Sequence, residues 1–464
     1  MSYYLLIDFG STFTKLTAVD ADFGDVIATA SHFTTVTTDI REGYHNALEI
    51  IYKKIGKKIQ FDYKIACSSA AGGLKMAAVG LVQELTVEAA KRVCLGAGAR
   101  VDLVCAHHLT KKDIQDIVDL KIDIILLAGG ADGGNTESVL FNARKLGEAG
   151  IKIPVVYAGN KSCQDEIEDI FKEYGIDGYI SENVMPKINV LNVKSARDKI
   201  REIFLKQIIE GKGIKKIEAE IDRVILPTPE AVLQAGELLS RGYLNERGLG
   251  DIVMVDVGGA TTDIYSICNS TSRSDVVLHG LEEPFAKRTV EGDLGMRYSA
   301  PGIVKSLTKE EIIQISETLN LDLEKEVNYR FHHVDMVPDN DHDEYVDQLL
   351  AKICVYRAMN RHVGRIEEVL TPMGIIYNQI GKDLTNVGYV IGTGGVVIKS
   401  NNPADILYQT TNIKQTPGEL RPQDPKYLLD SDYILAAMGL LSQSDPSLAL
   451  KIMKRHLMPL EKKV

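Results

Sequence analysis

A short pattern of residue types suited to binding a nucleotide phosphate occurs twice in this sequence. Residues 6–15 read LIDFGSTFTK, and residues 254–263 read MVDVGGATTD. In each copy an apolar run leads to an aspartate, a glycine follows two residues later, and hydroxyl side chains come next. Mg²⁺ is usually held by one or two carboxylates together with substrate phosphates and water. Asp8 and Asp256 could therefore share one Mg²⁺ ion if the two copies faced each other across a cleft.

The residues that follow each aspartate add the donors that a phosphate requires. Gly10 and Gly258 permit a tight turn in which successive backbone N–H groups converge on phosphate oxygens. Lys15 adds a compact positive charge after the first turn, whereas Asp263 stands at the equivalent place in the second copy. A single copy would be interpreted as an ordinary glycine-containing hairpin. The repetition is what favours a phosphate clamp.

A third motif, IGTGGVV at residues 391–397, follows both hairpins in the chain. Glycines after an apolar strand let a flat ribose or adenine lie against the backbone, because no Cβ atom intervenes. Taken alone the motif is weak, since strand-to-helix turns also use glycine for packing. The three motifs together predict an ATP and Mg²⁺ site. The expected ATP-contacting residues are Gly10, Ser11, Thr12, Thr14, Lys15, Gly258, Gly259, Ala260, Thr261, Thr262, Gly392, Thr393, Gly394 and Gly395.

The apolar pattern predicts the elements that must hold these motifs. Each half is expected to begin with a meander of three strands broken at glycines. The expected strands are 3–8, 12–20 and 25–33 in the first half, and 251–256, 262–269 and 275–279 in the second. A further strand is expected at 63–68. The expected helices are 42–55, 229–241, 308–320, 343–381 and 432–441.

Between the two halves the pattern changes to short buried strands that alternate with helices. Strands are expected at 121–127, 154–158 and 178–181, with helices at 137–148 and 164–174. This β-α-β-α-β alternation predicts a small parallel-sheet domain inserted into the first half. A charged amphipathic helix at 193–210 leads out of it.

Composition limits the class of protein. A chain of 464 residues is too long for one ordinary core, so several domains are expected. The net charge of -11 argues against a broad nucleic-acid or anionic-membrane surface. Six scattered cysteines without C-x-x-C spacing indicate neither a disulfide framework nor a zinc knuckle. With no basic leader and no apolar run near ~20 residues, a cytoplasmic location is expected.

The order of the three motifs resembles the phosphate-1, phosphate-2 and adenosine motifs of the actin, hexokinase and heat-shock-chaperone ATPases. Residues 226–236, LPTPEAVLQAG, and 432–439, DYILAAMG, resemble the two connecting helices of that superfamily. The resemblance implies an α/β fold of two duplicated ribonuclease-H-like, actin-like ATPase domains that close on MgATP. It also implies that Asp8 and Asp256 organise Mg²⁺ and the attacking water, with Glu230 as a nearby water-orienting group.

A narrower resemblance covers most of the chain. The runs at 8–15, 127–135 (LAGGADGGN) and 290–297 (VEGDLGMR) are similar to the MutL (GlmL) family encoded beside glutamate mutase and related aminomutases. The resemblance implies an ATP-dependent reactivating factor that frees damaged cobalamin from adenosylcobalamin-dependent mutase subunits, its partners. It also implies that Glu291 reaches the nucleotide. Whether the protein forms a homo-oligomer stays open.

The expected domains follow from these patterns together. The first ATPase half takes 1–70, 222–250 and 430–464, the second takes 251–429, and 71–221 forms the inserted domain, expected to bind the partner.

Other functions stay open at this point. A small-molecule kinase of the same superfamily would need an acceptor pocket, for which no motif is recognised. A redox activator would need cysteines that share an iron–sulfur cluster, whereas these cysteines are dispersed. A nucleotide-gated scaffold would use the same fold without needing turnover.

Two weaker motifs also have alternative interpretations. The glycines at 129–135 form either a ligand loop or a plain turn. The His/Asp-rich stretch 332–344 is expected to be a solvated acidic loop.

Overall fold

The computed structural model describes ten stretches of the chain. They are residues 2–10, 12–34, 39–69, 74–94, 97–187, 190–211, 219–269, 276–280, 282–372 and 374–461. Ser11, one of the expected ATP-contacting residues, lies outside the described residues. In the described part, no helix combines the length and the apolar character needed to cross a membrane.

The first sheet has the strand order β10-β4-β1-β2-β3. Its strands are β1 (Tyr3–Phe9), β2 (Phe13–Asp20), β3 (Asp25–Phe33), β4 (Tyr63–Ser68) and β10 (Arg223–Pro227). Strand β2 runs antiparallel to β1 and β3, whereas β4 runs parallel to β1 and β10 runs parallel to β4. Helix α1 (Ile40–Ile55) is capped by the Asp39 side chain and buries Tyr44, Ala47 and Ile51. The strands expected for the first meander are confirmed.

The second sheet has the strand order β16-β14-β13-β19-β20-β21. Its strands are β13 (Ile252–Val257), β14 (Thr262–Ile267), β16 (Ala286–Glu291), β19 (Tyr389–Thr393), β20 (Lys426–Asp430) and β21 (Leu457–Leu460). Strand β14 is antiparallel to β13 and β16, and β19 and β20 follow in parallel. The first five strands therefore repeat the order and directions of the first sheet, which confirms the predicted duplicated α/β fold.

Two predictions for the second half are wrong. The third meander strand is β16, not residues 275–279, because β16 pairs with β14 over six residues. The described part of the expected strand, β15 (Val277–His279), instead pairs with β18 (Gly374–Ile380) in a separate sheet. The helix expected over 343–381 also ends early.

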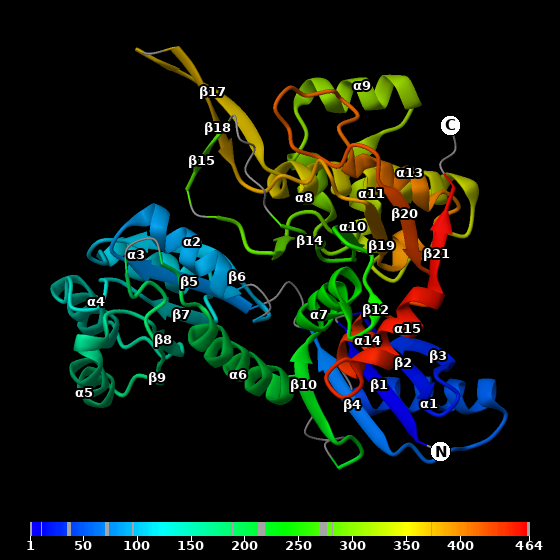
Figure 1. The fold of residues 1–464 in the computed structure, drawn as a ribbon, viewed down its shortest axis with the longest axis horizontal. Coiled ribbons are helices and arrows are strands. Elements are labelled where there is room, and N and C mark those ends of the chain that lie inside the picture. The colour runs from blue at the N-terminus through cyan, green and yellow to red at the C-terminus, as the bar shows by residue number, and fades with distance from the viewer. Residues whose placement is uncertain are drawn as a thin grey trace.

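Helix α11 (Asp341–His362) stops before Gly364, and the hairpin of β17 (Arg365–Thr371) and β18 follows. Residues 365–380 contain many isoleucine, valine and tyrosine side chains, which favour strand over helix. The hairpin projects away from the second sheet (Figure 1).

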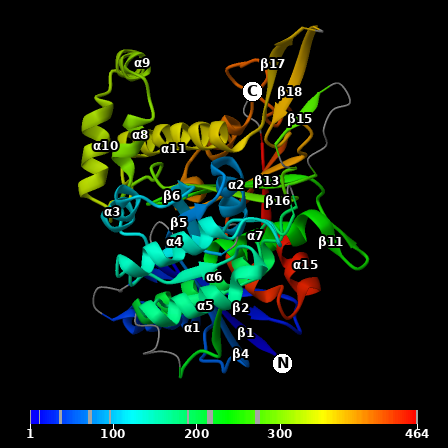
Figure 2. The same cartoon turned by 90° about the vertical axis from the view of Figure 1, so that its left-hand side faces the viewer.

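The elements between β4 and β10 form a third sheet, entirely parallel, with the order β6-β5-β7-β8-β9. Its strands are β5 (Leu74–Gly80), β6 (Ala99–Ala106), β7 (Ile124–Leu127), β8 (Val155–Tyr157) and β9 (Gly178–Ile180). Its helices are α2 (Gln83–Cys94), α3 (Lys111–Asp119), α4 (Glu137–Glu148), α5 (Gln164–Tyr174) and α6 (Lys194–Gly211). We call residues 74–211 the inserted unit. It lies beside both halves in Figure 1 and in front of them in Figure 2.

The inserted unit shares its core with the first sheet. Ile7 and Tyr44 of the first half belong to one buried cluster with Ala78 and Phe204 of the inserted unit. The predicted strands and helices of this region are present, and the structure adds β5 and β6, which the sequence patterns missed. The exact domain boundaries stay a prediction.

Two helices join the two large sheets. Helix α7 (Thr228–Arg241) packs against α14 (Leu435–Leu441), and both belong to a buried cluster with Leu6 of β1 and Met254 of β13. A Cβ atom on Gly439 would overlap the backbone of Ala231, so glycine is what allows this close approach. The C-terminal segment differs from the expectation in one respect: β21 joins the second sheet, although α15 (Pro446–His456) packs on α7.

The remaining elements are short or lie at the edge of the second half. They are β11 (Gly242–Tyr243), β12 (Glu246–Arg247), α8 (Ala300–Lys305), α9 (Lys309–Leu319), α10 (Leu323–His332), α12 (Gly395–Lys399) and α13 (Pro403–Leu407).

Candidate ATP site

Both aspartate hairpins and part of the glycine motif line one cavity of about 740 Å³. The expected site residues in its wall are Asp8, Gly10, Thr12, Lys15, Asp256, Gly258, Gly259, Ala260, Thr261, Thr393 and Gly395. The structure therefore brings the three motifs together, as the repeat predicted. The other described residues on the expected list, Thr14, Glu230, Thr262, Glu291, Gly392 and Gly394, are not part of that wall.

The same backbone hydrogen bond closes the two hairpins. The N–H of Gly10 donates to the carbonyl of Phe13 over 3.1 Å, and the N–H of Gly258 donates to the carbonyl of Thr261 over 2.9 Å. The strand register places Asp8 directly opposite Lys15. In the second hairpin, the register places Asp256 opposite Asp263. The two hairpins thus share this closing hydrogen bond and carry opposite charges at this one position.

Asp8 is held by groups from three elements. The Lys15 ammonium lies 3.5 Å from Asp8 Oδ2, and the Thr228 hydroxyl at the start of α7 donates to Asp8 Oδ1 over 2.6 Å. The Cys67 thiol lies 3.6 Å from the same oxygen. Lys15 Nζ also sits 3.5 Å from the centre of the Tyr433 ring, a cation–π contact. Sequence reasoning missed Thr228 and Tyr433.

In the described part of the chain, no side chain forms a hydrogen bond or an ion pair with the Asp256 carboxylate. Desolvation by the surrounding protein raises the pKa of Asp256 to about 7, and the negative charge of Asp263 adds to this rise. Lys15 acts in the opposite direction. Asp263 itself is neutralised by Arg288, whose Nε donates to Asp263 Oδ1 over 2.8 Å. Asp256 is therefore a carboxylate that a bound cation would stabilise.

The donor set fits Mg²⁺ held jointly by protein and nucleotide. The described residues contain no group of three or more His, Cys, Asp or Glu side chains that could hold a metal ion. Mg²⁺ does not need such a cage, because one or two carboxylates, waters and substrate phosphates complete its octahedron. Asp8 and Asp256, on the wall of one cavity, are the residues that would supply these carboxylates.

The glycine motif packs against the second aspartate. Gly394 has a φ of +93°, and a Cβ atom there would lie 2.8 Å from Asp256 Oδ1. A Cβ on Gly395 would meet no atom within 4 Å, so this residue opens to the cavity. Thr393 donates to Asp430 Oδ2 over 3.0 Å, and Asp430 in turn accepts from the first N–H groups of α14. The motif thus links the cavity wall to the joining helix.

Four expected site residues form hydrogen bonds outside the cavity wall: Thr14, Thr262, Glu291 and Glu230. Thr14 is buried beside Thr34, with their hydroxyls 3.1 Å apart, and the Thr262 hydroxyl donates to Leu294 O over 2.6 Å. Glu291 Oε2 accepts from Arg361 Nη1 over 2.6 Å.

Glu230 is buried, and its Oε1 accepts from Gln234 over 2.7 Å and from Arg201 over 3.4 Å. Burial raises the pKa of Glu230, although the nearby arginines oppose the rise. The water-orienting role expected for Glu230 and the nucleotide contact expected for Glu291 stay predictions.

Residues 295–298, which follow Glu291, pack against the turn of the second hairpin. The N–H groups of Arg297 and Tyr298 both donate to Gly259 O, over 2.8 and 2.9 Å. A Cβ on Gly295 would overlap Ala260, so the segment lies tightly against the turn. This segment contains part of the 290–297 run on which the family resemblance rested. The end of the 290–297 run thus has a structural role, because it contacts the turn of the second hairpin.

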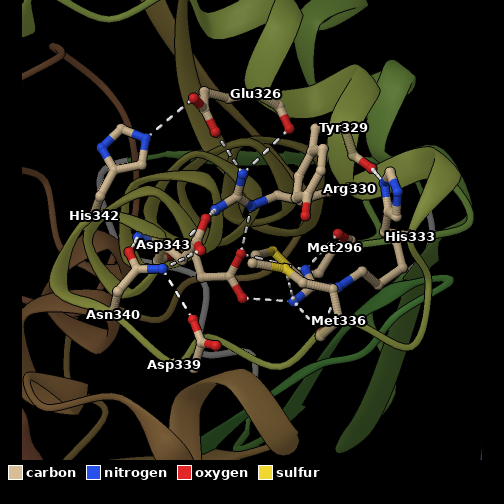
Figure 3. A network of polar contacts seen from close by, with 12 residues as sticks. Met296, Glu326, Tyr329, Arg330, His333, Met336, Asp339, Asn340, His342 and Asp343 are labelled. Carbon is tan, nitrogen blue, oxygen red and sulfur yellow. Dashed lines mark hydrogen bonds and ion pairs between the residues drawn. The ribbon is translucent and has the colours of Figure 1, made fainter.

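The Arg297 side chain belongs to a buried ionic network that includes Asp347 and Arg330. Figure 3 shows Arg330 of this network with Glu326 and Asp343. Arg297 Nη2 donates to Asp347 Oδ2 over 2.7 Å, and the fully buried Arg330 donates to Asp347 Oδ1 over the same distance. Arg330 also contacts Glu326 and Asp343. The 332–344 stretch is therefore not simply the solvated loop expected from its composition, because Asp343 is drawn into this network. Residues 334–338 of the stretch line the cavity.

The raised pKa of Asp256 predicts a pH-dependent stability in the absence of Mg²⁺ and nucleotide. The unfolded carboxyl ionises near pH 4, whereas the folded one ionises near pH 7, so the folded state binds the extra proton between these values. Stability is therefore lost as pH rises through this window. Compared with Asp256→Asn, the wild type should lose about 1–2 kcal/mol between pH 5 and pH 8 after allowance for solvent screening. Urea denaturation of both proteins at the two pH values measures this, and parallel pH profiles would contradict the assignment.

Comparison with known proteins identifies the family. The family described as MutL protein matches residues 4–457. A relative named Protein MutL, from Clostridium tetanomorphum, is 50% identical over 459 residues, which cover 98% of this chain and 99% of the relative.

Solved structures show more distant likenesses. A nucleotide-free acetone carboxylase is 14% identical with a TM-score of 0.40, covering 95% of this chain and 70% of its own. A glycerol dehydratase reactivase is 10% identical with a TM-score of 0.35, covering 96% of this chain and 100% of its own. With TM-scores this low, the family rests on the sequence matches. By its match over almost the whole length and its 50% identical relative, this chain belongs to the MutL family.

Proposed function

We propose that this protein binds and hydrolyses ATP in order to reactivate an adenosylcobalamin-dependent mutase, glutamate mutase or a related aminomutase, by releasing damaged cobalamin. Membership of the MutL family supports the association with a mutase. The observation that carries the ATPase part is the meeting of two equivalent aspartate hairpins and a glycine motif on one cavity. The raised pKa of Asp256 adds support, because it marks a carboxylate that needs a cation.

The site residues would divide the work as follows. Asp8 and Asp256 would hold Mg²⁺, which would supply positive charge to neutralise the phosphates. The turn N–H groups and hydroxyls after Gly10 and Gly258 donate to phosphate oxygens. Lys15 places its charge beside Asp8, held in position by the Tyr433 ring. The Thr228 hydroxyl fixes the orientation of the Asp8 carboxylate from the start of α7.

The joining helices give ATP binding a mechanical consequence. One phosphate chain contacted by both hairpins would draw the two sheets together, and α7 and α14 are the elements across which they turn. Helix α7 carries both Thr228, which contacts Asp8, and Glu230, which contacts Arg201 of α6. Movement at the site would therefore reach the inserted unit, which we assign to mutase binding. Closure and release would loosen the mutase enough for damaged cobalamin to leave.

Steady-state ATPase assays with and without a mutase test this proposal. We expect slow basal hydrolysis that requires Mg²⁺ and rises several-fold with an aminomutase inactivated by its own turnover. Mutase activity should return when ATP and fresh adenosylcobalamin are present, and a nonhydrolysable ATP analogue should not restore it. Co-purification from the native source identifies the mutase to use. Retained ATP binding without stimulation by any co-purifying mutase would contradict the proposal.

A further inference from the structure

An arginine of the inserted unit forms part of the wall of the proposed ATP site. Residues 98–100 line the same cavity as Asp8 and Asp256, although Ala99 and Arg100 belong to the third sheet. Arg100 lies near the start of β6, the edge strand of that sheet. The inserted unit therefore contributes a cation to a cavity otherwise built largely by the two duplicated halves.

Arg100 also fits closely against the second half. A Cβ atom built on Gly292 would overlap Arg100 Nη1, so a larger residue there would displace the guanidinium. Gly292 does not have a positive φ, and its backbone would accept any residue. Glycine at this position therefore leaves room for the Arg100 guanidinium where it lies. Hydrogen bonds from Arg361 hold the pKa of the neighbouring Asp293 below its usual range, and the charge of Arg100 adds a smaller effect in the same direction.

The three arginines in the described cavity wall differ in what holds them. Arg288 is bound to the buried Asp263, and Arg297 is bound to the buried Asp347. Arg100 pairs with Asp102, two residues along its own strand, and both side chains are partly exposed. Exposed pairs of this kind contribute little to stability and can be exchanged for a stronger partner. Arg100 is therefore the arginine best placed to exchange its carboxylate for a phosphate.

We propose that Arg100 binds a phosphate of the nucleotide, so that the inserted unit senses the nucleotide directly. This inference rests on the proposed ATP site. A guanidinium is permanently charged and presents paired donors that match phosphate oxygens. Because Arg100 is fixed to β6, a partner that shifts the inserted unit would also shift this cation within the cavity. Partner binding and ATP hydrolysis would then be coupled through one side chain.

Three variants test the assignment. Arg100→Ala removes the guanidinium, Arg100→Lys keeps a charge without the paired donors, and Gly292→Ala displaces the guanidinium while leaving Arg100 in place. Arg92→Ala is the matched control. Arg92 belongs to the inserted unit and donates to Glu282 O of the second half, but it does not line the cavity. Thermal unfolding confirms that each variant is folded before binding is measured.

The readouts are MgATP and adenosine affinities by calorimetry, kcat and KM, and stimulation by the mutase. Loss of a charged hydrogen bond predicts that Arg100→Ala weakens MgATP binding by about 10- to 100-fold and leaves adenosine affinity unchanged. Arg100→Lys should recover part of the loss, Gly292→Ala should reproduce the loss, and Arg92→Ala should bind like the wild type.

Unchanged MgATP affinity and kcat in Arg100→Ala would overturn the inference while leaving the ATPase proposal intact. An equal loss in Arg92→Ala would also overturn it, since the effect would then come from the interface as a whole. Failure of the wild type itself to bind MgATP would overturn both proposals.

Discussion

Changing Asp256 to alanine should abolish Mg²⁺-dependent ATP hydrolysis, with kcat falling by about 100-fold or more because one ligand of the ion is lost. Asp256 is the second carboxylate of the clamp, and burial together with the charge of Asp263 raises its pKa to about 7. Steady-state hydrolysis measured across a Mg²⁺ titration tests this. Nucleotide binding without Mg²⁺ should persist, since the backbone donors of both turns stay in place.

Asp251→Ala is the matched control for this experiment. Asp251 directly precedes the same strand, β13, at the end far from the turn, and it does not line the cavity. Its loss should change kcat by no more than about twofold. A wild-type hydrolysis rate in the Asp256→Ala protein would refute the site assignment. Equal losses in both proteins would indicate that damage to β13, not loss of an ion ligand, causes the effect.

Changing Arg330 to methionine should cause the largest loss of stability, about 3–5 kcal/mol in the free energy of unfolding. Arg330 is fully buried and contacts Asp347, Glu326 and Asp343. Its removal takes one counter-charge from the buried Asp347 and from the partly buried Glu326 and Asp343, and such a loss costs more than the ion pairs themselves contribute. Urea denaturation measures the change. Because Asp347 also binds Arg297, which supports the second hairpin, MgATP affinity should fall as well.

Arg365→Met provides the comparison for this loss. Arg365 is exposed and pairs with the exposed Glu367, so its replacement should change stability by at most about 0.5 kcal/mol. A loss below about 1 kcal/mol for Arg330→Met alone would show that the network is not energetically coupled to folding.

At the start of α7, the sequence predicted the helix but not which of its side chains contacts Asp8. The run TPEAV predicts a helix with proline near its first position, and the structure has it there. The resemblance pointed to Glu230 as the residue near the aspartates, whereas Thr228 makes the contact with Asp8. Residues two apart on a helix point in nearly opposite directions. Which of them faces the cavity depends on how α7 is rotated against the sheets, and packing sets that rotation.

The misassigned strands have a related cause. Residues 286–291 and the described part of the expected strand, 277–279, both carry strand-forming side chains. The choice between them as the third meander strand depends on which one pairs with β14 over its full length, a contact between distant segments. The hairpin at 365–380 was missed because the helical pattern of α11 was extended past Gly364.

The repeated aspartate-glycine pattern by itself determined the two turns, their carboxylates and their likeness, because each hairpin is made from contacts within about ten residues. Pairing in the strand register then placed Lys15 opposite Asp8 and Asp263 opposite Asp256. Tertiary structure alone decided that Arg288 neutralises Asp263, that Thr228 orients Asp8 and that Arg100 reaches the cavity from the inserted unit. These contacts join residues far apart in the chain, so they depend on the packing of whole sheets, which no local pattern encodes.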